Sequence, residues 1–268
     1  MDIPHLYSIQ DISRLYMTGD QPVLVLCSDT QQYICKYMRP NATIAYKLAC
    51  EYIGAVFADA WKIDTPPVSL VKITSMHWTS VTASHIPSAP AIGFKKIDRV
   101  IDITPTSFRQ VEANASTLYQ LLKIALFDFW IANEDRTCNN ANLLYDIDKE
   151  RLISIDYGGI LNNVSFDIPL SQLTETDSII CADIFAHIIK SVSLMQLAKT
   201  VEKLENDFIQ CINRSKRRTH LLTEMPIEWS VPIDKVKKKM EELFCPQWVR
   251  ATWENFVECL KSNSSYGK

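Results

Sequence analysis

The chain lacks the patterns that mark membrane proteins, secreted proteins and metal-cluster proteins. No apolar run among its 268 residues reaches the length of a membrane span, and residues 1–5 do not begin a signal peptide. The eight cysteines are scattered without a C-x-x-C pair and the five histidines lie far apart, so neither a disulfide framework nor a zinc site is predicted. A net charge of −3 gives no reason to expect non-specific nucleic-acid binding. These absences predict a compact cytoplasmic protein that binds neither membranes nor nucleic acids.

The most informative feature that is present is a group of acids and amides in two neighbouring segments. Asp135 and Asn140 belong to a polar run that starts at Asn133, and Asp156 comes shortly before Gly158. An Asp, an Asn five residues later and a strand-borne Asp before a glycine form the arrangement that phosphoryl transfer from Mg-ATP requires. One carboxylate orients or deprotonates the attacking hydroxyl, while the amide oxygen and the second carboxylate hold the metal. The alternative is ordinary turn residues, because Asn and Asp are common in loops.

The flanking sequence predicts where these residues lie. Apolar residues recur at helical spacing over 118–131, and two short apolar strands, 141–145 and 151–155, suit a hairpin. Asp135 then lies in a loop after a buried helix and Asp156 lies where a strand ends, so the two acids can converge on one cleft. Gly158 and Gly159 are expected to let the backbone turn sharply after Asp156.

The first half of the chain contains a candidate cation for the phosphates of ATP. Apolar strands are predicted on both sides of the turn at 28–32, and Lys36 is the only charge inside the second of them. A lysine on the inner face of a hairpin is costly unless it is paired or binds an anion, although a lysine that reaches solvent at a sheet edge is an alternative. Glu51, on a predicted helix over 43–58, could pair with Lys36 in the ion pair of an active kinase, or it could be an exposed helix residue.

Taken together, the first 165 residues resemble the HipA-like serine/threonine kinases, particularly their short stand-alone versions. These kinases share with the phosphatidylinositol 3- and 4-kinases a loop of the form Asp-Arg-His-x-x-Asn, and residues 135–140 of this chain match it as Asp-Arg-Thr-Cys-Asn-Asn. The resemblance implies that Asp135 is the catalytic aspartate, with Arg136 stabilising the loop or the transferring phosphate. It also implies that Asn140 and Asp156 are the metal ligands and that Lys36 is the ATP-binding lysine.

The resemblance further implies the rest of a nucleotide site. Gly19 is similar to the turn that covers the phosphates, and Ser84, His85 and Ile86 are similar to the hinge that contacts adenine. Two departures stand out. Thr137 replaces the usual histidine of the loop, and the phosphate-covering turn has one glycine rather than several.

The expected architecture is an α+β, two-lobed, protein-kinase-like fold of the HipA and phosphatidylinositol-kinase type. Residues 1–88 would form a small, mainly β N-lobe, and residues 89–268 a helical C-lobe with the catalytic loop. The expected activity is Mg-ATP-dependent phosphorylation of a serine or threonine in a protein substrate or in the chain itself. Thr137 and the poor glycine turn leave open a nucleotide-binding pseudokinase that regulates a partner protein. A helical scaffold with chance matches is a further alternative.

Overall fold

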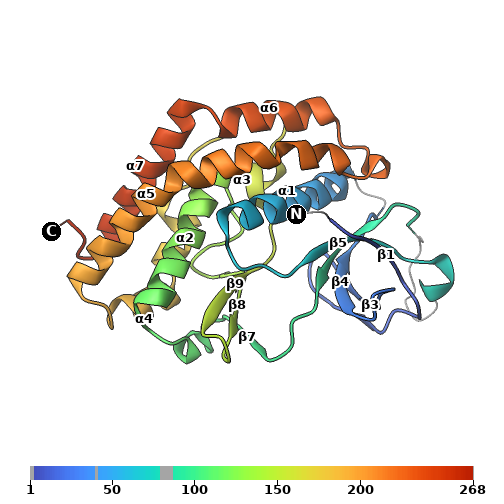
Figure 1. Ribbon diagram of the computed structural model, residues 1–268, viewed down its shortest axis with the longest axis horizontal. Helices are drawn as coiled ribbons and strands as arrows, with labels where there is room; N and C mark the ends of the chain where they lie inside the picture. Colours follow the sequence, from blue (N-terminus) through green and yellow to red (C-terminus); the bar gives the residue numbers. More distant parts are fainter. Residues whose placement is uncertain (1–2, 40–41, 79–86, 268) are drawn as a thin grey trace.

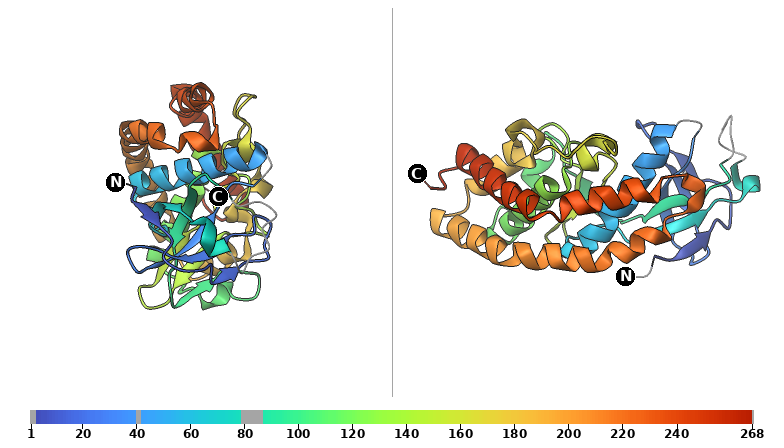
Figure 2. Two further views of the ribbon diagram at one scale, coloured as in Figure 1. Left: turned by 90° about the vertical axis from the view of Figure 1, so that its right-hand side faces the viewer. Right: turned by 90° about the horizontal axis from the view of Figure 1, so that it is seen from above.

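A six-stranded sheet and a set of packed helices make up most of the molecule, and a small three-stranded sheet lies between them. The computed structural model describes residues 3–39, 42–78 and 87–267. Seen from above in Figure 2, the larger sheet lies at one end of the molecule and the long C-terminal helices run lengthwise toward it, beside α1 (Ala42–Trp61). The order of β-rich and helical parts confirms the predicted α+β class. No helix in the described ranges is long and apolar enough to cross a membrane.

The larger sheet has the strand order β1-β5-β6-β4-β3-β2. Its strands are β1 (His5–Tyr7), β2 (Arg14–Leu15), β3 (Val23–Leu26), β4 (Gln32–Lys36), β5 (Val68–Lys72) and β6 (Ala91–Lys95). Only β1 and β5 run parallel; the other neighbours are antiparallel. In β4, Tyr33 and Cys35 face a small core under the sheet, so the alternation predicted for this strand turns Ile34 and Lys36 to the other face.

The predicted division after residue 88 stays a prediction, but the sheet assigned to the first part takes one strand from beyond it. Strand β6 was not predicted, because Pro87, Pro90 and Gly93 make residues 86–93 typical of a linker in the sequence. It pairs with β4 on one side and with β5 on the other. A Cβ atom on Gly93 would come within 2.7 Å of a Val71 methyl group, so this glycine allows close packing within the sheet.

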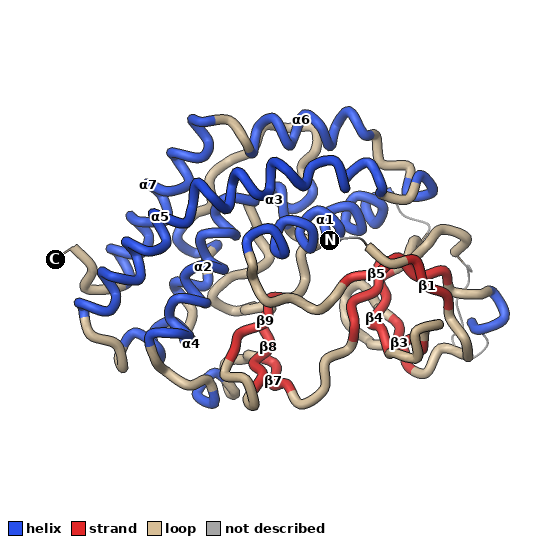
Figure 3. The backbone as a smooth tube through the Cα atoms, viewed as in Figure 1, coloured by secondary structure: helices blue, strands red, loops and turns tan. Residues whose placement is uncertain are grey.

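The smaller sheet holds the hairpin predicted from the second half of the chain. Strands β8 (Leu143–Asp146) and β9 (Arg151–Ser154) form the hairpin, and β7 (Val100–Asp102), which was not predicted, pairs with β8 as a third strand. Figure 3 shows this sheet beside the larger one, with a loop segment leading from the larger sheet to β7. The two sheets therefore face each other across the connection that follows β6.

The helices enclose the main core. They are α2 (Ala115–Ile131), α3 (Ile160–Val164), α4 (Asp183–Ile189), α5 (Leu194–Arg218), α6 (Ile233–Leu243) and α7 (Pro246–Asn263). In Figure 1, α5, α6 and α7 cover α1 and α2 on the side away from the small sheet. Trp61 of α1 stacks on Trp130 of α2 with 5.5 Å between ring centroids, and both rings are almost fully buried. This aromatic contact ties α1 to the helix that leads into the predicted catalytic loop.

Helix α2 ends where the sequence predicts and begins three residues before the predicted range of 118–131. The side chain of Asn114 accepts hydrogen bonds from the backbone N–H groups of Ser116 and Thr117, which caps the first turn. At the other end Ala132 adopts a left-handed conformation with φ of 53°, so the helix stops at Ile131. The polar run from Asn133 therefore leaves the helix as a loop.

Candidate active site

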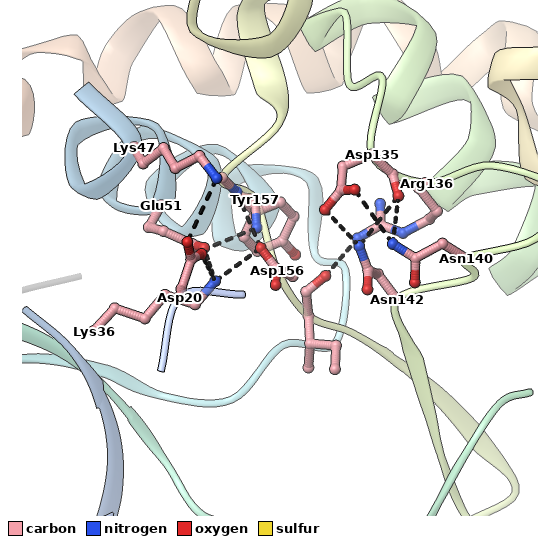
Figure 4. Close-up of polar contacts among 12 residues, drawn as sticks. Asp20, Lys36, Lys47, Glu51, Asp135, Arg136, Asn140, Asn142, Asp156 and Tyr157 are labelled. Atoms are coloured by element: carbon pink, nitrogen blue, oxygen red, sulfur yellow. Dashed lines mark hydrogen bonds and ion pairs between the residues drawn. The ribbon is translucent and has the colours of Figure 1, made fainter. Parts of the chain in front are cut away.

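Lys36 lies at the centre of a cluster of acidic side chains between the larger sheet and α1. Its Nζ donates to Oε1 of Glu51 and, at 2.8 Å, to Oδ1 of Asp156. Asp20, in the turn before β3, approaches the same nitrogen at 3.5 Å. Figure 4 shows the three carboxylates converging on the lysine from three different segments. The pairing of Lys36 with Glu51 that the sequence suggested is therefore present.

The electrostatics of this cluster differ from one acid to the next. Burial alone would lower the pKa of Lys36, but the charges of Glu51 and Asp156 raise it, so the ammonium stays protonated. Burial raises the pKa of Glu51 to about 8, because it outweighs the attraction of Lys36. For Asp156 burial acts in the same direction, but the Lys36 charge and the hydrogen bonds with Glu51, Lys36 and the backbone N–H of Gly158 together outweigh it and lower the pKa to about 2. The side chain of Asp156 is 33% exposed while that of Glu51 is 1% exposed, so only Asp156 can also reach a ligand.

Close backbone packing brings the Asp156 segment against both α1 and the catalytic loop. A Cβ atom on Gly54 would lie 2.3 Å from Cβ of Tyr157, and one on Gly159 would lie 2.4 Å from Cβ of Asp135. The approach to α1 lets the backbone N–H of Tyr157 donate to Oε2 of Glu51 at 2.9 Å. The turn expected after Asp156 is present at Gly158 and Gly159, but neither glycine has a positive φ; Asp156 itself has one, of 59°, and Gly159 is needed for space.

Asp135 sits in the loop after α2, and two asparagines hold it. Asn140 donates through Nδ2 to the backbone oxygen of Asp135 at 3.0 Å and to Oδ1 at 3.3 Å. Asn142 donates through Nδ2 to Oδ2 of Asp135 at 3.0 Å and to the backbone oxygen at 3.2 Å. Burial and the negative charge of Asp156 raise the pKa of Asp135 above its ordinary value. Thr137 shapes the same loop, because its backbone N–H donates to the backbone oxygen of Asn140 at 2.9 Å.

Asn142 was not among the residues predicted from the sequence, although its position is distinctive. It directly precedes β8, and its backbone oxygen accepts from the N–H of Ile155 at 3.1 Å, so it stands across the hairpin from the residue before Asp156. Asn140 and Asn142 both use the amide nitrogen for Asp135, which leaves the amide oxygen as a possible metal ligand. The signal in the sequence was an amide at the start of one hairpin strand and an acid at the end of the other.

These oxygens suit a metal that also takes ligands from a phosphate. The described residues contain no group of three or more His, Cys, Asp or Glu side chains that could hold a metal ion without other ligands. The partly exposed carboxylate of Asp156 with one or two amide oxygens is the incomplete set typical of Mg²⁺, which fills its octahedron with water and substrate phosphates. The donors present therefore fit Mg²⁺ bound together with a nucleotide.

Arg136 does not lie with the acids that face the cleft. Its side chain is fully buried and donates to Asp128, to Oγ of Ser154 at 2.7 Å, and to the backbone oxygens of Ala141 at 3.1 Å and Ile155 at 2.9 Å. These acceptors belong to α2, to the end of the catalytic loop and to β9 with its continuation. Of the two roles considered for Arg136, this geometry suits stabilisation of the loop.

A cavity of about 440 Å³ opens beside Lys36 and Asp156, between the two sheets. Its apolar walls include Ile34 and Phe94 from the larger sheet and Leu144 and Ile155 from the hairpin. Lys95, Lys96 and Ile97, where the chain leaves β6 for the smaller sheet, line it as well. Sequence reasoning did not assign these residues; it placed the hinge at Ser84, His85 and Ile86, which lie outside the described residues.

Gly19, the remaining predicted residue, lies in the turn over the cluster. Its neighbour Asp20 contacts Lys36 and also Lys47 of α1, at 3.4 Å. No heavy atom lies within 4 Å of a Cβ built on Gly19, so its space is open. The structure thus brings Lys36, Glu51 and Asp156 to the cavity, and Gly19 lies next to the residue that contacts Lys36.

Comparisons with known proteins agree on one family and one fold. The model of the HipA-like kinase family matches residues 9–256. Among solved structures, the proinflammatory kinase CtkA of Helicobacter pylori aligns with a TM-score of 0.56 at 9% identity, over 95% of this chain and 99% of that chain. The open conformation of CtTel1 aligns with a TM-score of 0.34 at 10% identity, over 90% of this chain and 11% of that one, which is too low to support an argument. No curated protein matches the chain in sequence. The likeness to CtkA confirms the predicted kinase-like fold.

Proposed function

This chain belongs to the HipA-like kinase family, and we propose that it transfers the γ-phosphate of ATP to a serine or threonine hydroxyl of a protein. The observation that carries the proposal is the meeting of Lys36, Glu51 and Asp156 at one end of an apolar cavity, next to the loop that holds Asp135. Catalysis of phosphoryl transfer consists almost entirely of positioning and charge stabilisation, and these are the groups it needs.

The cavity between the sheets is the proposed nucleotide site. Ile34, Phe94, Leu144 and Ile155 offer apolar surfaces for the two faces of an adenine ring, and the connection after β6 runs along its edge. We assign the hinge role to residues 95–97 on this basis. Ser84, His85 and Ile86 remain candidates from the family resemblance alone.

The proposed phosphate and metal groups follow from their charge and exposure. Lys36, held by Glu51, would bind the α- and β-phosphates, and the partly exposed carboxylate of Asp156 would hold Mg²⁺ with the amide oxygen of Asn142 or Asn140. Bound Mg²⁺ would neutralise the charge that develops on the phosphate oxygens. Gly19 would let the covering turn approach the phosphates closely.

Asp135 is proposed to orient the acceptor hydroxyl and to accept its proton. Two asparagine donors fix its carboxylate, and a pKa raised by burial and by Asp156 makes it a better proton acceptor than an ordinary aspartate. Arg136 acts through position: by bonding Ala141 and Ile155 it holds the loop of Asp135 against the strand end that carries Asp156. The hydroxyl group that accepts the phosphate belongs to a protein substrate or to another part of this chain.

The test is transfer of labelled γ-phosphate from ATP, with and without Mg²⁺, to the purified chain and to a mixture of protein substrates. We expect label on serine or threonine in the wild type and none with Asp135→Asn or Asp156→Asn. Asp148→Asn, which removes a carboxylate from an exposed surface ion pair, should label like the wild type. Binding of Mg-ATP without transfer to any protein would contradict the proposal and favour a nucleotide-binding regulator.

A further inference from the structure

We propose that Lys47 is a second phosphate-binding lysine and that the carboxylate of Asp20 takes the place of a nucleotide phosphate between Lys36 and Lys47 when no nucleotide is bound. The inference rests on the proposed nucleotide site and adds to it a ligand residue and a built-in competitor. Asp20 belongs to the turn that resembles the phosphate-covering turn of the family, but its side chain was given no role, and Lys47 was not among the residues of the resemblance.

Asp20 joins two cations that come from different elements. One carboxylate oxygen, Oδ2, lies 3.5 Å from Nζ of Lys36 at the end of β4, and the other, Oδ1, lies 3.4 Å from Nζ of Lys47 on α1. Figure 4 shows the carboxylate between the two ammonium groups. A phosphate offers the same kind of bridging oxygens with more charge, so two lysines that share a carboxylate can also share a phosphate.

The contacts of Asp20 are the loosest in the cluster. Lys36 holds Glu51 directly and Asp156 at 2.8 Å, whereas both contacts of Asp20 exceed 3.3 Å and its side chain is 28% exposed. Glu51 and Asp156 belong to a helix and to a strand end, but Asp20 belongs to a turn. A more highly charged anion that enters from the cavity would therefore displace Asp20 before it displaced the other two acids.

Lys47 is placed to serve the same anion as Lys36. It precedes Glu51 by four residues on α1, which puts both side chains on the face of the helix that looks toward Lys36. Asp20 is its one ion-pair partner among the described residues, and its side chain is 38% exposed. Once Asp20 moves away, the ammonium of Lys47 is left beside Lys36, in the small pocket that both lysines line with Glu51.

Arg39 holds the turn of Asp20 in this closed position. Its guanidinium donates to the side chain of Gln21 at 3.3 Å and to the backbone oxygen of Gly19 at 3.4 Å, on either side of Asp20. Its third nitrogen, Nε, is buried and has no hydrogen-bond partner among the described residues. A third cation, Arg39, therefore holds the turn, and one of its N–H donors has no partner among the described residues.

The experiment measures equilibrium binding of ATP and of AMP, both with Mg²⁺, by calorimetry on the full chain. The variants are Asp20→Asn, Lys47→Gln and the two combined. AMP lacks the β- and γ-phosphates, so the difference between the two nucleotides isolates the phosphate contacts. Asp148→Asn and Lys199→Gln are matched controls that change the same charges at exposed positions away from the cavity. Thermal unfolding of each variant shows that it is folded.

We expect Asp20→Asn to tighten ATP binding about tenfold, which corresponds to about 1.4 kcal/mol, and to change AMP binding less than about threefold. Adding Lys47→Gln to Asp20→Asn should remove this gain, and both controls should bind ATP like the wild type. Equal or weaker ATP binding by Asp20→Asn, or an equal gain for AMP, would overturn the inference while leaving the nucleotide site intact. Failure of the folded wild type to bind ATP at all would overturn the proposed function and this inference with it.

Discussion

The buried pair of Arg136 and Asp128 gives the sharpest prediction about what holds the candidate site together. Both side chains are almost completely excluded from solvent, and Arg136 also bonds Ser154, Ala141 and Ile155. Removing one partner of a buried ion pair costs about 3–5 kcal/mol, because the other charge stays buried without compensation. Arg136→Met should therefore lower the free energy of unfolding by about 3–5 kcal/mol, a large part of the total for a typical domain.

A double-mutant cycle tests whether the loss comes from the pair. Asp128→Asn alone should destabilise by about 3 kcal/mol, since it leaves the arginine charge buried. The double variant should lose at least about 2 kcal/mol less than the sum of the two single losses, because it leaves no unpaired charge. Urea unfolding followed by circular dichroism gives these values from the midpoints, provided that the denaturant slope is unchanged.

Arg99→Met is the matched control for this cycle. Arg99 pairs with Asp148 at 3.0 Å on the surface, where its side chain is 79% exposed, so its removal should cost less than about 1 kcal/mol. A loss below about 1 kcal/mol for Arg136→Met, or additive losses in the cycle, would refute the reasoning.

The remaining predictions concern the catalytic loop, the nucleotide lysine and one helix end. Asn142→Ala should lower kcat about 100-fold and Asn140→Ala less, in steady-state assays, because Asn142 stands beside the Asp156 strand; the reverse order would return the ligand role to Asn140. The raised pKa of Asp135 means that it is protonated, and stops acting as a proton acceptor, at a higher pH than an ordinary aspartate. We therefore expect kcat/KM to fall with decreasing pH with an apparent pKa above about 3.9; an apparent pKa at or below that value would contradict this. Lys36→Met should weaken Mg-ATP binding about 100-fold by calorimetry, and unchanged affinity would exclude Lys36 from the site. Lys62 directly follows α1 and has a left-handed backbone conformation with φ of 55°, which glycine adopts at a lower cost than lysine. Lys62→Gly should therefore raise the urea midpoint by the equivalent of about 0.5–1 kcal/mol; a lower midpoint would show that strain there is negligible.

The sequence was sufficient for the elements whose signals are local. Lys36 stands out as a single charge in an apolar strand. Because burying an unpaired lysine costs free energy, an acidic partner on the next helix could be suggested, and the structure has Glu51 there. The end of α2 and the hairpin after it were equally readable, so Asp135 and Asp156 could be placed at a loop and at a strand end. The catalytic roles of these residues stay predictions.

The parts that escaped prediction depend on tertiary contacts. Gly93 in β6 suggested a linker, whereas the structure uses it for close packing against Val71, and that need appears only when β5 and β6 are side by side. The hinge role now proposed for residues 95–97 depends on the same strand, whereas the hinge predicted at Ser84, His85 and Ile86 lies outside the described residues and stays a prediction. Counting five residues from Asp135 selected Asn140, which stays a prediction; Asn142 was missed, because it meets Ile155 only when β8 pairs with β9.

Loss of the γ-phosphate from Mg-ATP, measured as ADP formed in the presence of protein acceptors and in water alone, tests the central claim most directly, because it does not require the acceptor to be known. We expect Mg²⁺-dependent ADP formation by the wild type and by Asp148→Asn, and none above background by Asp135→Asn or Asp156→Asn. Equal rates in all four proteins, or no ADP from a wild type that binds Mg-ATP, would contradict the assignment of this site to phosphoryl transfer.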